Sequence, residues 1–257
     1  MLILDEVVKT FGGHRAVDGV SFALAPGCIT GLIGPNGAGK TTLFNLIAGA
    51  HRPDSGRITL DGRVISGLWP DQVFQAGLAR TFQIPKPFAA MSVLENVMLA
   101  PKGQAGESFW RNWISPARVA REEAAVRERA MHWLDFVSLA RLAHEPARVL
   151  SGGQRKLLEL ARAMVSDPQL VLLDEPGAGV NPALLDTIVD RITTLHQQGV
   201  NVLNIEHNMD LVASLCNPVL VMAQGQLLAS GSAAQVLQDP RVIQAYLGGV
   251  PEAAAAT

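Results

Sequence analysis

The segment ITGLIGPNGAGKT at residues 29–41 decides the fold of this chain. Its first half is a short apolar run that predicts a buried strand, and its second half, GPNGAGKT at residues 34–41, fits the pattern G-x-x-x-x-G-K-[ST]. A helix is expected to begin near Lys40. A strand, a glycine-rich loop and a helix in this order predict a loop whose backbone N–H groups face a polyphosphate.

The residues of this loop have distinct expected roles. Glycines let the backbone N–H groups turn inward, Lys40 is expected to place its charge on the β- and γ-phosphates, and Thr41 is expected to bind Mg²⁺. The alternative, an ordinary glycine-rich turn, does not account for the strand and helix on either side. The residues predicted to bind nucleotide here are Gly34, Pro35, Asn36, Gly37, Ala38, Gly39, Lys40, Thr41 and Thr42.

Two acidic residues end a second apolar run, LVLLDEP at residues 170–176. The run predicts a buried strand whose carboxyl end lies where ligands bind in open α/β sheets. Asp174 is predicted to hold Mg²⁺, and Glu175 to polarise a water molecule for attack on the γ-phosphate. Alone, such a run is more often a strand that leads into a solvated loop. In a chain with a phosphate-binding loop, the catalytic interpretation is favoured.

A second helix start suited to an anion is predicted by LSGGQ at residues 150–154. Ser151 is a good N-cap, and the residues after it have the apolar periodicity of an amphipathic helix. Because the first loop already holds one nucleotide, this helix start is expected to bind the phosphate of a neighbouring molecule. An ordinary capped helix is the alternative.

The order of the predicted elements indicates an α/β fold with a mainly parallel sheet. An antiparallel β region precedes it, hairpins are expected at residues 58–65 and 219–229, and one helix is expected after the second hairpin. Residues 1–86 and 151–248 are predicted to form the nucleotide-binding core, and residues 87–150 an inserted helical subdomain. The alanine-rich tail at residues 249–257 is expected to be disordered.

Composition excludes several classes of protein. The formal net charge of −2, with acids and bases interspersed, argues against a nucleic-acid surface. Cys28 and Cys216 are far apart with no metal-binding spacing, which favours buried thiols in a reducing compartment. The N-terminal residues do not resemble a signal peptide, and the apolar runs are shorter than the roughly 20 residues of a membrane span. We therefore expect membrane association only through a partner.

Taken together, GPNGAGKT, Gln83 in TFQ, LSGGQ, LLDEP and His207 in IEHNM resemble the nucleotide-binding domain of ABC transporters over nearly the whole chain. The resemblance implies a P-loop NTPase core that pairs head to tail with a second ATP-binding subunit. Each ATP would lie between the phosphate-binding loop of one subunit and Ser151, Gly152, Gly153 and Gln154 of the other.

The resemblance also implies roles for single residues. Glu175, His207 and Lys40 would be catalytic, with His207 at the γ-phosphate, and Gln83 would join Thr41 and Asp174 as a Mg²⁺ ligand and link the site to the helical subdomain. Phe11 occupies the position of an aromatic residue that stacks on adenine, with Val17 beside it. These two residues are predicted to contact the nucleotide, although a core aromatic is the alternative for Phe11.

Three further segments resemble the ATPases of branched-chain amino acid importers. These are the stretch from LDEP to Asn181, where Asn replaces the family's usual Asp, TFQIPKPF at residues 81–88, and DPRVIQAYLG at residues 239–248. The resemblance implies hydrolysis of ATP for uptake of branched-chain amino acids or related small polar solutes, with importers of urea or amides as the alternative.

The implied assembly lies at the cytoplasmic face of the inner membrane. It contains transmembrane permease subunits, reached through the helical subdomain and the Gln83 loop, and indirectly a solute-binding protein. A soluble ABC protein would normally need a second cassette, and an exporter ATPase or a non-catalytic regulatory module is disfavoured by the subfamily segments and the complete catalytic set. The tract FWRNWI at residues 109–114 could pack on its own subdomain or dock on a partner.

Overall fold

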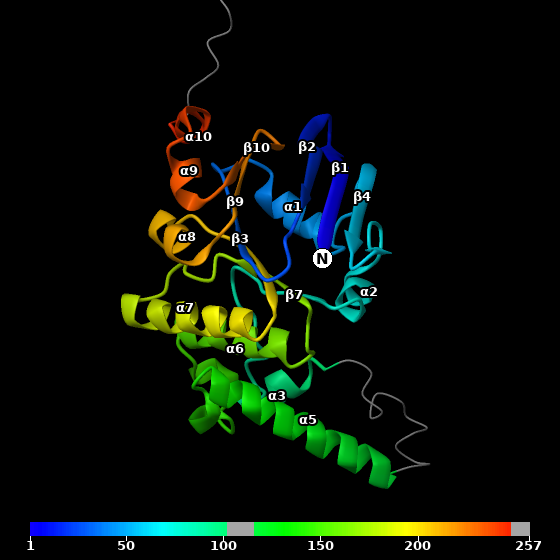
Figure 1. The fold of residues 1–257 in the computed structure, drawn as a ribbon. Helices are drawn as coiled ribbons and strands as arrows, with labels where there is room; N and C mark the ends of the chain where they lie inside the picture. The colour runs from blue at the N-terminus through cyan, green and yellow to red at the C-terminus, as the bar shows by residue number, and fades with distance from the viewer. Residues whose placement is uncertain (102–115, 248–257) are drawn as a thin grey trace, which may run out of the picture.

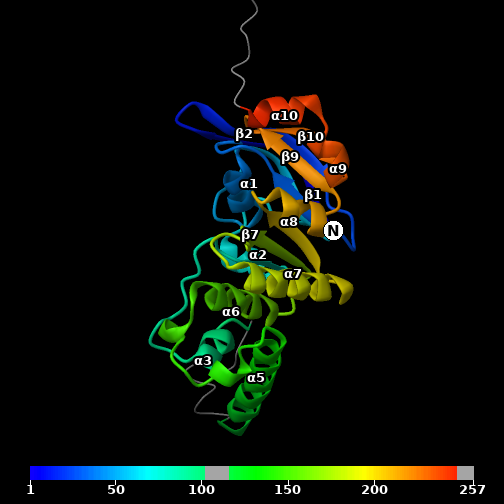
Figure 2. The same ribbon diagram turned by 90° about the vertical axis from the view of Figure 1, so that its left-hand side faces the viewer.

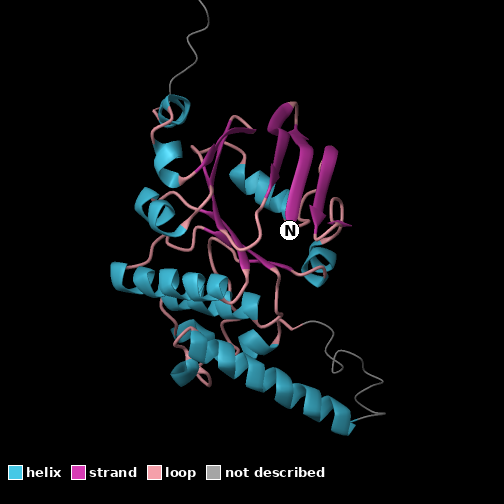
Figure 3. Ribbon diagram, in the orientation of Figure 1, coloured by secondary structure: helices cyan, strands magenta, loops and turns pink. Residues whose placement is uncertain are grey.

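The computed structural model describes residues 1–101 and 116–247. Two β-sheets in the described chain enclose one helix, and further helices extend below them (Figures 1 and 3). The tract at residues 109–114 and the tail at residues 249–257 lie outside the described residues. In the described ranges, no helix is both long enough and apolar enough to cross a membrane.

The larger sheet has six strands in the order β10-β9-β3-β8-β7-β6. All neighbouring pairs are parallel except β9 and β10, which form the predicted hairpin. The strands are β3 (Ile29–Ile33), β6 (Leu78–Arg80), β7 (Leu170–Asp174), β8 (Asn201–Ile205), β9 (Val219–Ala223) and β10 (Gln226–Gly231). The predicted mainly parallel sheet is therefore confirmed.

The smaller sheet is antiparallel, with the strand order β2-β1-β4-β5. Its strands are β1 (Leu2–Phe11), β2 (His14–Ala23), β4 (Ser55–Leu60) and β5 (Arg63–Val64). Helix α1 (Lys40–Ile47) lies between the two sheets, as Figure 1 shows, and its Phe44 and Ile47 are fully buried there. The phosphate-binding loop is thus attached to a helix held from both sides.

Alternate side chains of the parallel strands enter two different hydrophobic clusters. In β7, Leu170 and Leu172 face the cluster around α1, whereas Val171 and Leu173 face the cluster beneath the sheet. All five residues of β7 are buried, because both faces of the sheet are covered. This burial leaves only the ends of the parallel strands accessible to a ligand.

Helices on the other side of the parallel sheet form two layers (Figures 1 and 2). The layer next to the sheet contains α6 (Gly152–Met164) and α7 (Pro182–Gln197), and the outer layer contains α3 (Val93–Met98) and α5 (Pro116–Phe136). Buried residues of α3, α5 and α6 belong to one cluster with the sheet. The remaining helical elements are α2 (Pro70–Gln75), η2 (Ala140–Leu142), η3 (Ala147–Val149), α8 (Met209–Leu215), α9 (Ala233–Leu237) and α10 (Pro240–Tyr246).

The expectation of one helix after the second hairpin is wrong, because the chain forms two short helices there, α9 and α10. Pro240 cannot continue a helix from residues before it, and the residue that precedes a proline is disfavoured in the helical conformation. Asp239 instead caps α10 by accepting a hydrogen bond from the backbone N–H of Arg241, at 2.8 Å. The break between the helices therefore lies in the sequence itself.

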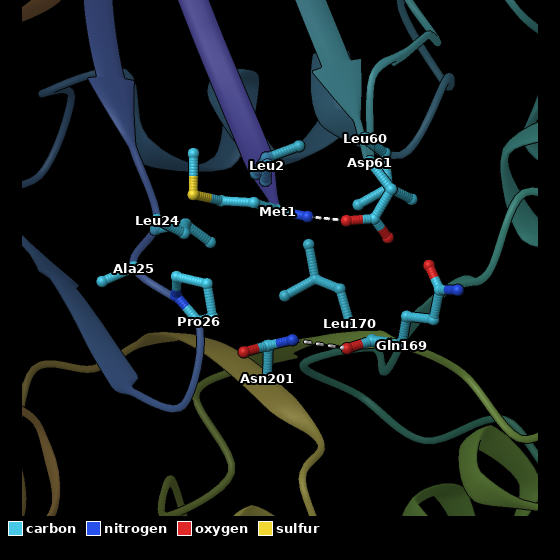
Figure 4. Close-up of a pocket in the computed structure, with 10 residues that line it drawn as sticks. All are labelled: Met1, Leu2, Leu24, Ala25, Pro26, Leu60, Asp61, Gln169, Leu170 and Asn201. Atoms are coloured by element: carbon cyan, nitrogen blue, oxygen red, sulfur yellow. Dashed lines mark hydrogen bonds and ion pairs between the residues drawn. The ribbon is translucent and has the colours of Figure 1, made fainter.

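Figure 4 shows a small pocket between the antiparallel sheet and the amino ends of β7 and β8. The amino group of Met1 pairs with Asp61 on one side, and on the other the Asn201 amide donates to the Gln169 carbonyl oxygen at 3.1 Å. Since the phosphate-binding loop follows the carboxyl end of β3, this pocket lies at the opposite end of the parallel strands. The pocket lies where the two sheets meet, and none of its lining residues lines the nucleotide pocket.

Candidate nucleotide site

A pocket lies at the carboxyl ends of the parallel strands. Its lining comes from β2, from the loop that follows β3, from the start of α1 and from the segments that follow β6, β7 and β8. Carboxyl ends of parallel strands share one edge of the sheet, which is where open α/β sheets bind ligands. The lining residues are His14, Ala16, Asn36, Gly37, Ala38, Gly39, Lys40, Thr41, Thr42, Gln83, Glu175 and His207.

The loop after β3 needs glycine at two positions, Gly34 and Gly39, for the same two reasons. Gly34 and Gly39 both have positive φ angles, of 150° and 97°. A Cβ at Gly34 would lie 2.1 Å from the Met222 carbonyl oxygen, and one at Gly39 would lie 2.2 Å from the Ala16 carbonyl oxygen. The loop is therefore packed closely against β9 and β2.

Lys40 folds back over this loop. Its Nζ donates hydrogen bonds to the carbonyl oxygens of Gly34 and Pro35, at 2.7 and 2.9 Å, and only 6% of the residue is exposed. Burial lowers the pKa of Lys40, and the nearby carboxylates of Glu175 and Asp174 oppose that shift. A polyphosphate in the pocket would supply the negative charge that the two carbonyl oxygens supply only in part.

Glu175 has both carboxylate oxygens engaged. Its Oε1 lies 2.8 Å from His207 Nε2, and its Oε2 accepts a hydrogen bond from Gln83 Nε2 at 2.7 Å. The structure thus brings together three residues that are far apart in sequence and were predicted to serve one site. A carboxylate at this edge of the pocket can accept a proton from a water molecule once one of these contacts opens.

The backbone of Glu175 is strained, with a φ angle of 50° in the left-handed region. Its N–H donates to the Ile205 carbonyl oxygen at 3.0 Å. Its own carbonyl oxygen accepts hydrogen bonds from Ala178 N, at 3.1 Å, and from Lys156 Nζ, at 2.6 Å. The main-chain conformation of Glu175 is therefore held by contacts from three separate segments.

Asp174 pairs with Arg80, a residue that sequence reasoning missed. Arg80 Nη2 lies 3.0 Å from Asp174 Oδ2, and Arg80 Nη1 donates to Asn45 Oδ1 at 2.6 Å. The pair is largely buried, so the carboxylate is held in one orientation. Arg80 lies at the carboxyl end of β6 beside β7, and the sequence pattern at residues 78–80 predicts no strand that would have indicated this place.

Glu206, the residue before His207, was also missed. Its carboxylate is 2% exposed and accepts hydrogen bonds from Gly177 N at 2.9 Å, from His207 N at 3.1 Å and from Asn208 N at 3.4 Å. Backbone donors of this kind stabilise a buried carboxylate. Glu206 therefore ties the segment after Glu175 to the segment that carries His207.

The predicted Mg²⁺ ligands offer oxygen atoms, which is the donor type that Mg²⁺ prefers. They combine one carboxylate, from Asp174, with the hydroxyl of Thr41 and the amide of Gln83. Within the described part of the chain, no three His, Cys, Asp or Glu side chains gather in a dedicated metal cage. The residues therefore fit a Mg²⁺ ion that takes its other ligands from phosphate oxygens and water.

The LSGGQ segment begins α6 and lies outside the lining of the nucleotide pocket. Ser151 Oγ accepts a hydrogen bond from Gln154 N at 3.3 Å, and Gln154 Oε1 accepts one from Ser151 N at 2.9 Å, so the helix start has a capping box. A Cβ added at Gly152 would meet no described atom within 4 Å. The described part of this subunit therefore does not require glycine at residue 152. The open space beside it can hold part of a neighbouring molecule.

Four more residues that were predicted to contact the nucleotide lie outside the lining as well: Gly34, Pro35, Phe11 and Val17. Phe11 is 44% exposed and packs edge-to-face on His51, with ring centroids 5.4 Å apart. Val17 is fully buried in the cluster around α1. The pocket wall on this side is formed by His14 and Ala16. The roles predicted for Phe11 and Val17 stay predictions.

Asn181, expected from the resemblance to stand in place of an aspartate, caps α7. Its Oδ1 accepts a hydrogen bond from Leu184 N at 2.9 Å. Asn and Asp are comparable N-caps, so the substitution preserves this local structure.

Residues 17–178 match the model described as "ABC transporter", and residues 226–251 match the model described as "Branched-chain amino acid ATP-binding cassette transporter". The second match contains β10, α9 and α10. Together the two models account for both the phosphate-binding loop and the two C-terminal helices.

Curated relatives match nearly the whole chain. The "Probable branched-chain amino acid transport ATP-binding protein LivG" of Archaeoglobus fulgidus is 41% identical, covering 96% of this chain and 95% of that protein. The high-affinity branched-chain amino acid transport ATP-binding protein BraF of Pseudomonas aeruginosa is 40% identical, covering 96% and 98%.

Solved structures of ATP-binding cassettes also match nearly the whole chain. A nucleotide-free ATP-binding cassette from an ABC transporter has a TM-score of 0.84 and 37% identity, covering 97% of this chain and 99% of that one. An ATP-binding cassette in its ADP conformation has a TM-score of 0.81 and 36% identity over the same shares. This chain is an ATP-binding cassette of the ABC transporter family, an ATPase, and it belongs with the branched-chain amino acid transport ATP-binding proteins of that family.

Proposed function

We propose that this chain powers the import of branched-chain amino acids or related small polar solutes by hydrolysing ATP at the pocket described above. The proposal of this substrate class is supported by the relatives' names and by the match over residues 226–251. One observation carries the hydrolytic role: Glu175 stands at the edge of the phosphate-binding pocket, in contact with both His207 and Gln83.

In the proposed reaction, the backbone N–H groups of the loop and Lys40 hold the β- and γ-phosphates. Glu175 exchanges one of its present contacts for a water molecule and accepts its proton as the water oxygen attacks the γ-phosphorus. The bond from the γ-phosphorus to the bridging oxygen breaks, and ADP leaves with the electron pair. His207 is the donor beside Glu175 that can contact the γ-phosphate.

Mg²⁺, when bound, supplies positive charge that offsets the negative charge of the β- and γ-phosphate oxygens. Thr41 and Asp174, with Gln83, are the residues that would hold it. Arg80 keeps the Asp174 carboxylate oriented toward this edge of the sheet through the ion pair described above.

A second ATP-binding subunit completes each site in our proposal. Ser151, Gly152, Gly153 and Gln154 of one subunit would contact the nucleotide held by the other. The support is that these residues lie outside this chain's own pocket, although their capped helix start is suited to an anion. The second subunit is either another copy of this chain or a sister ATPase.

Permease subunits are proposed to bind near the Gln83 loop and residues 87–150, the proposed helical subdomain. The large apolar side chains of Phe82, Ile84 and Phe88 flank Gln83 and are 60%, 70% and 53% exposed. Exposed apolar side chains gathered in one segment are typical of a protein interface. Bound in this way, the chain would sit peripherally on the cytoplasmic face of the membrane, and a solute-binding protein would act on the opposite side.

Uptake by vesicles that contain the assembled transporter tests the substrate class. With ATP inside, we expect labelled leucine, isoleucine or valine to accumulate, and vesicles with the Glu175→Gln variant to accumulate none. Labelled urea and acetamide are the comparison solutes. Uptake of urea or amides without uptake of branched-chain amino acids would overturn the substrate assignment and leave the ATPase role intact.

A further inference from the structure

Helix α6 makes a hydrogen bond to Glu175, the proposed catalytic residue, within the same subunit. Lys156, which lies beyond the first turn of this helix, donates a hydrogen bond from Nζ to the Glu175 carbonyl oxygen at 2.6 Å. The acceptor belongs to a residue with a strained backbone, whose φ angle is 50°. A contact to the main chain at this point bears on the orientation of the whole Glu175 residue.

The same helix touches the other end of the loop that follows Glu175. Gly153 lies so close to the start of α7 that an added Cβ would be 2.0 Å from Leu184 Cδ2 and 3.6 Å from Val180 Cγ1. Lys156 hydrogen-bonds to residue 175, and Gly153 lies next to the side chains of residues 180 and 184. The beginning of α6 therefore holds both ends of the loop at residues 175–181.

The environment of Lys156 indicates that the bond is specific. The side chain is half-buried, and burial lowers the pKa of Lys156, while the nearby carboxylates of Glu206, Glu175 and Asp174 oppose the shift. Its hydrogen bond goes to a main-chain oxygen and to none of these carboxylates. Among the residues that the structure describes, the Glu175 carbonyl oxygen would keep the bond from Ala178 N once Lys156 is removed.

We propose that Lys156 is a positioning residue that couples the start of α6 to Glu175 within one subunit. This inference rests on the proposed function, in which Ser151 to Gln154 contact the nucleotide held by the second subunit. Binding of that nucleotide favours one position of α6, and Lys156 carries this preference to Glu175. Each of the two ATP sites then controls hydrolysis at the other.

Such coupling requires that the phosphate bind better to one arrangement of α6 than to the other. The structure supplies the physical link, since the same short helical segment carries Ser151, Gly153 and Lys156. No large movement is needed, because a small shift of α6 displaces the Glu175 main chain through a direct bond.

A double-mutant cycle on ATP turnover by the assembled transporter tests the coupling. Ser151→Ala and Lys156→Met are measured alone and together. Lys156→Met is expected to lower kcat about tenfold while the ATP affinity of the full-length chain stays unchanged. The factor by which Ser151→Ala lowers kcat is expected to be about fivefold smaller in the Lys156→Met background than in the wild type. The reason is that the hydrogen bond between α6 and Glu175 is already absent in that background.

Arg155→Met is the matched control. Arg155 neighbours Lys156 on α6, but it donates to the carbonyl oxygens of Leu150 and Arg148 and not to the loop after Glu175. In that background, Ser151→Ala should cost as much as in the wild type. Lys156→Arg keeps a charged donor and is expected to restore most of the coupling. If thermal unfolding shows that Lys156→Met does not fold, Lys156→Leu, which also lacks a donor, carries the same expectation.

The coupling would be overturned if Ser151→Ala lowered ATP turnover by the same factor in the wild-type and Lys156→Met backgrounds. It would also be overturned if the Arg155→Met background reduced the effect of Ser151→Ala as much as the Lys156→Met background does. These outcomes leave the proposed function standing if the wild type hydrolyses ATP and Glu175→Gln does not. A wild-type complex without ATP turnover would count against the proposed function itself and the coupling with it.

Discussion

His207 Nε2 lies 2.8 Å from Glu175 Oε1, and this contact joins the carboxyl ends of β8 and β7 across the nucleotide pocket. Gln83 Nε2 holds the other Glu175 oxygen at 2.7 Å. In the subunit on its own, the residue that is proposed to activate water is therefore engaged by two side chains. Because Ser151 to Gln154 of a second subunit are proposed to complete each site, the chain alone should be a poor ATPase.

Replacing His207 tests whether its place beside Glu175 matters for hydrolysis. His207→Ala removes one polar group next to the reacting phosphate, and we expect kcat to fall about a hundredfold with a smaller change in KM. Steady-state phosphate release by the assembled transporter is the measurement. His196→Ala, on α7 and outside both the pocket lining and residues 87–150, is the control and should retain wild-type turnover. Full activity of His207→Ala would exclude the residue from the reaction.

Lys40→Ala should weaken nucleotide binding itself. The buried Nζ then no longer contributes its charge to the pocket, and we expect the ATP affinity to fall by at least about tenfold, the equivalent of 1.4 kcal/mol. Equilibrium titration with a fluorescent ATP analogue measures the change. Lys86→Ala is the comparison, because Lys86 is exposed and lies outside the pocket lining. Equal affinities of the two variants would contradict the role given to Lys40.

The N-cap at Asn181 predicts that Asn181→Ala is less stable than Asn181→Asp. Asn181→Ala removes the acceptor for Leu184 N, which should lower the free energy of unfolding by about 1 kcal/mol. Asn181→Asp keeps an acceptor and should change it by only a few tenths of a kcal/mol. Urea denaturation of the two variants checks this, and equal stability of Asn181→Ala and the wild type would show that the cap contributes nothing.

Thiol chemistry should distinguish the two cysteines. Burial raises the pKa of Cys216 to about 11, so at pH 8 only about one thiol in a thousand is the reactive thiolate. The thiolate fraction grows as the pH rises toward 11. Cys28 is partly exposed. Alkylation at pH 8, read by peptide mass spectrometry, should modify Cys28 first and Cys216 only in denaturant, whereas equal labelling of the native protein would contradict the burial of Cys216.

Sequence reasoning predicts the parts of the site that are continuous along the chain. The strand at residues 29–33, the loop after it and the acidic end of β7 follow from apolar runs, glycines and charge at fixed spacing, and the structure has the strand, helix and hairpins in those places. Local patterns suffice there because neighbouring residues determine the backbone conformation.

Contacts between separate elements are less accessible to such reasoning. Arg80 and Lys156 reach Asp174 and the Glu175 main chain from other elements, and no spacing in the sequence indicates which long side chain spans which gap. Which side chains of a strand reach a pocket is also hard to predict from sequence. Val17 was predicted to contact the nucleotide, but its side chain lies in the hydrophobic cluster around α1. Only the packing of β2 on that helix determines that His14 and Ala16 line the pocket.

Phosphate release by the assembled transporter with Glu175→Gln tests the central claim most directly. The amide keeps the size of the side chain and can still contact His207 or Gln83, but it cannot accept the proton of the attacking water. We predict that ATP binding is retained while turnover falls at least about a hundredfold. Turnover close to that of the wild type would contradict the assignment of Glu175 as the residue that activates water.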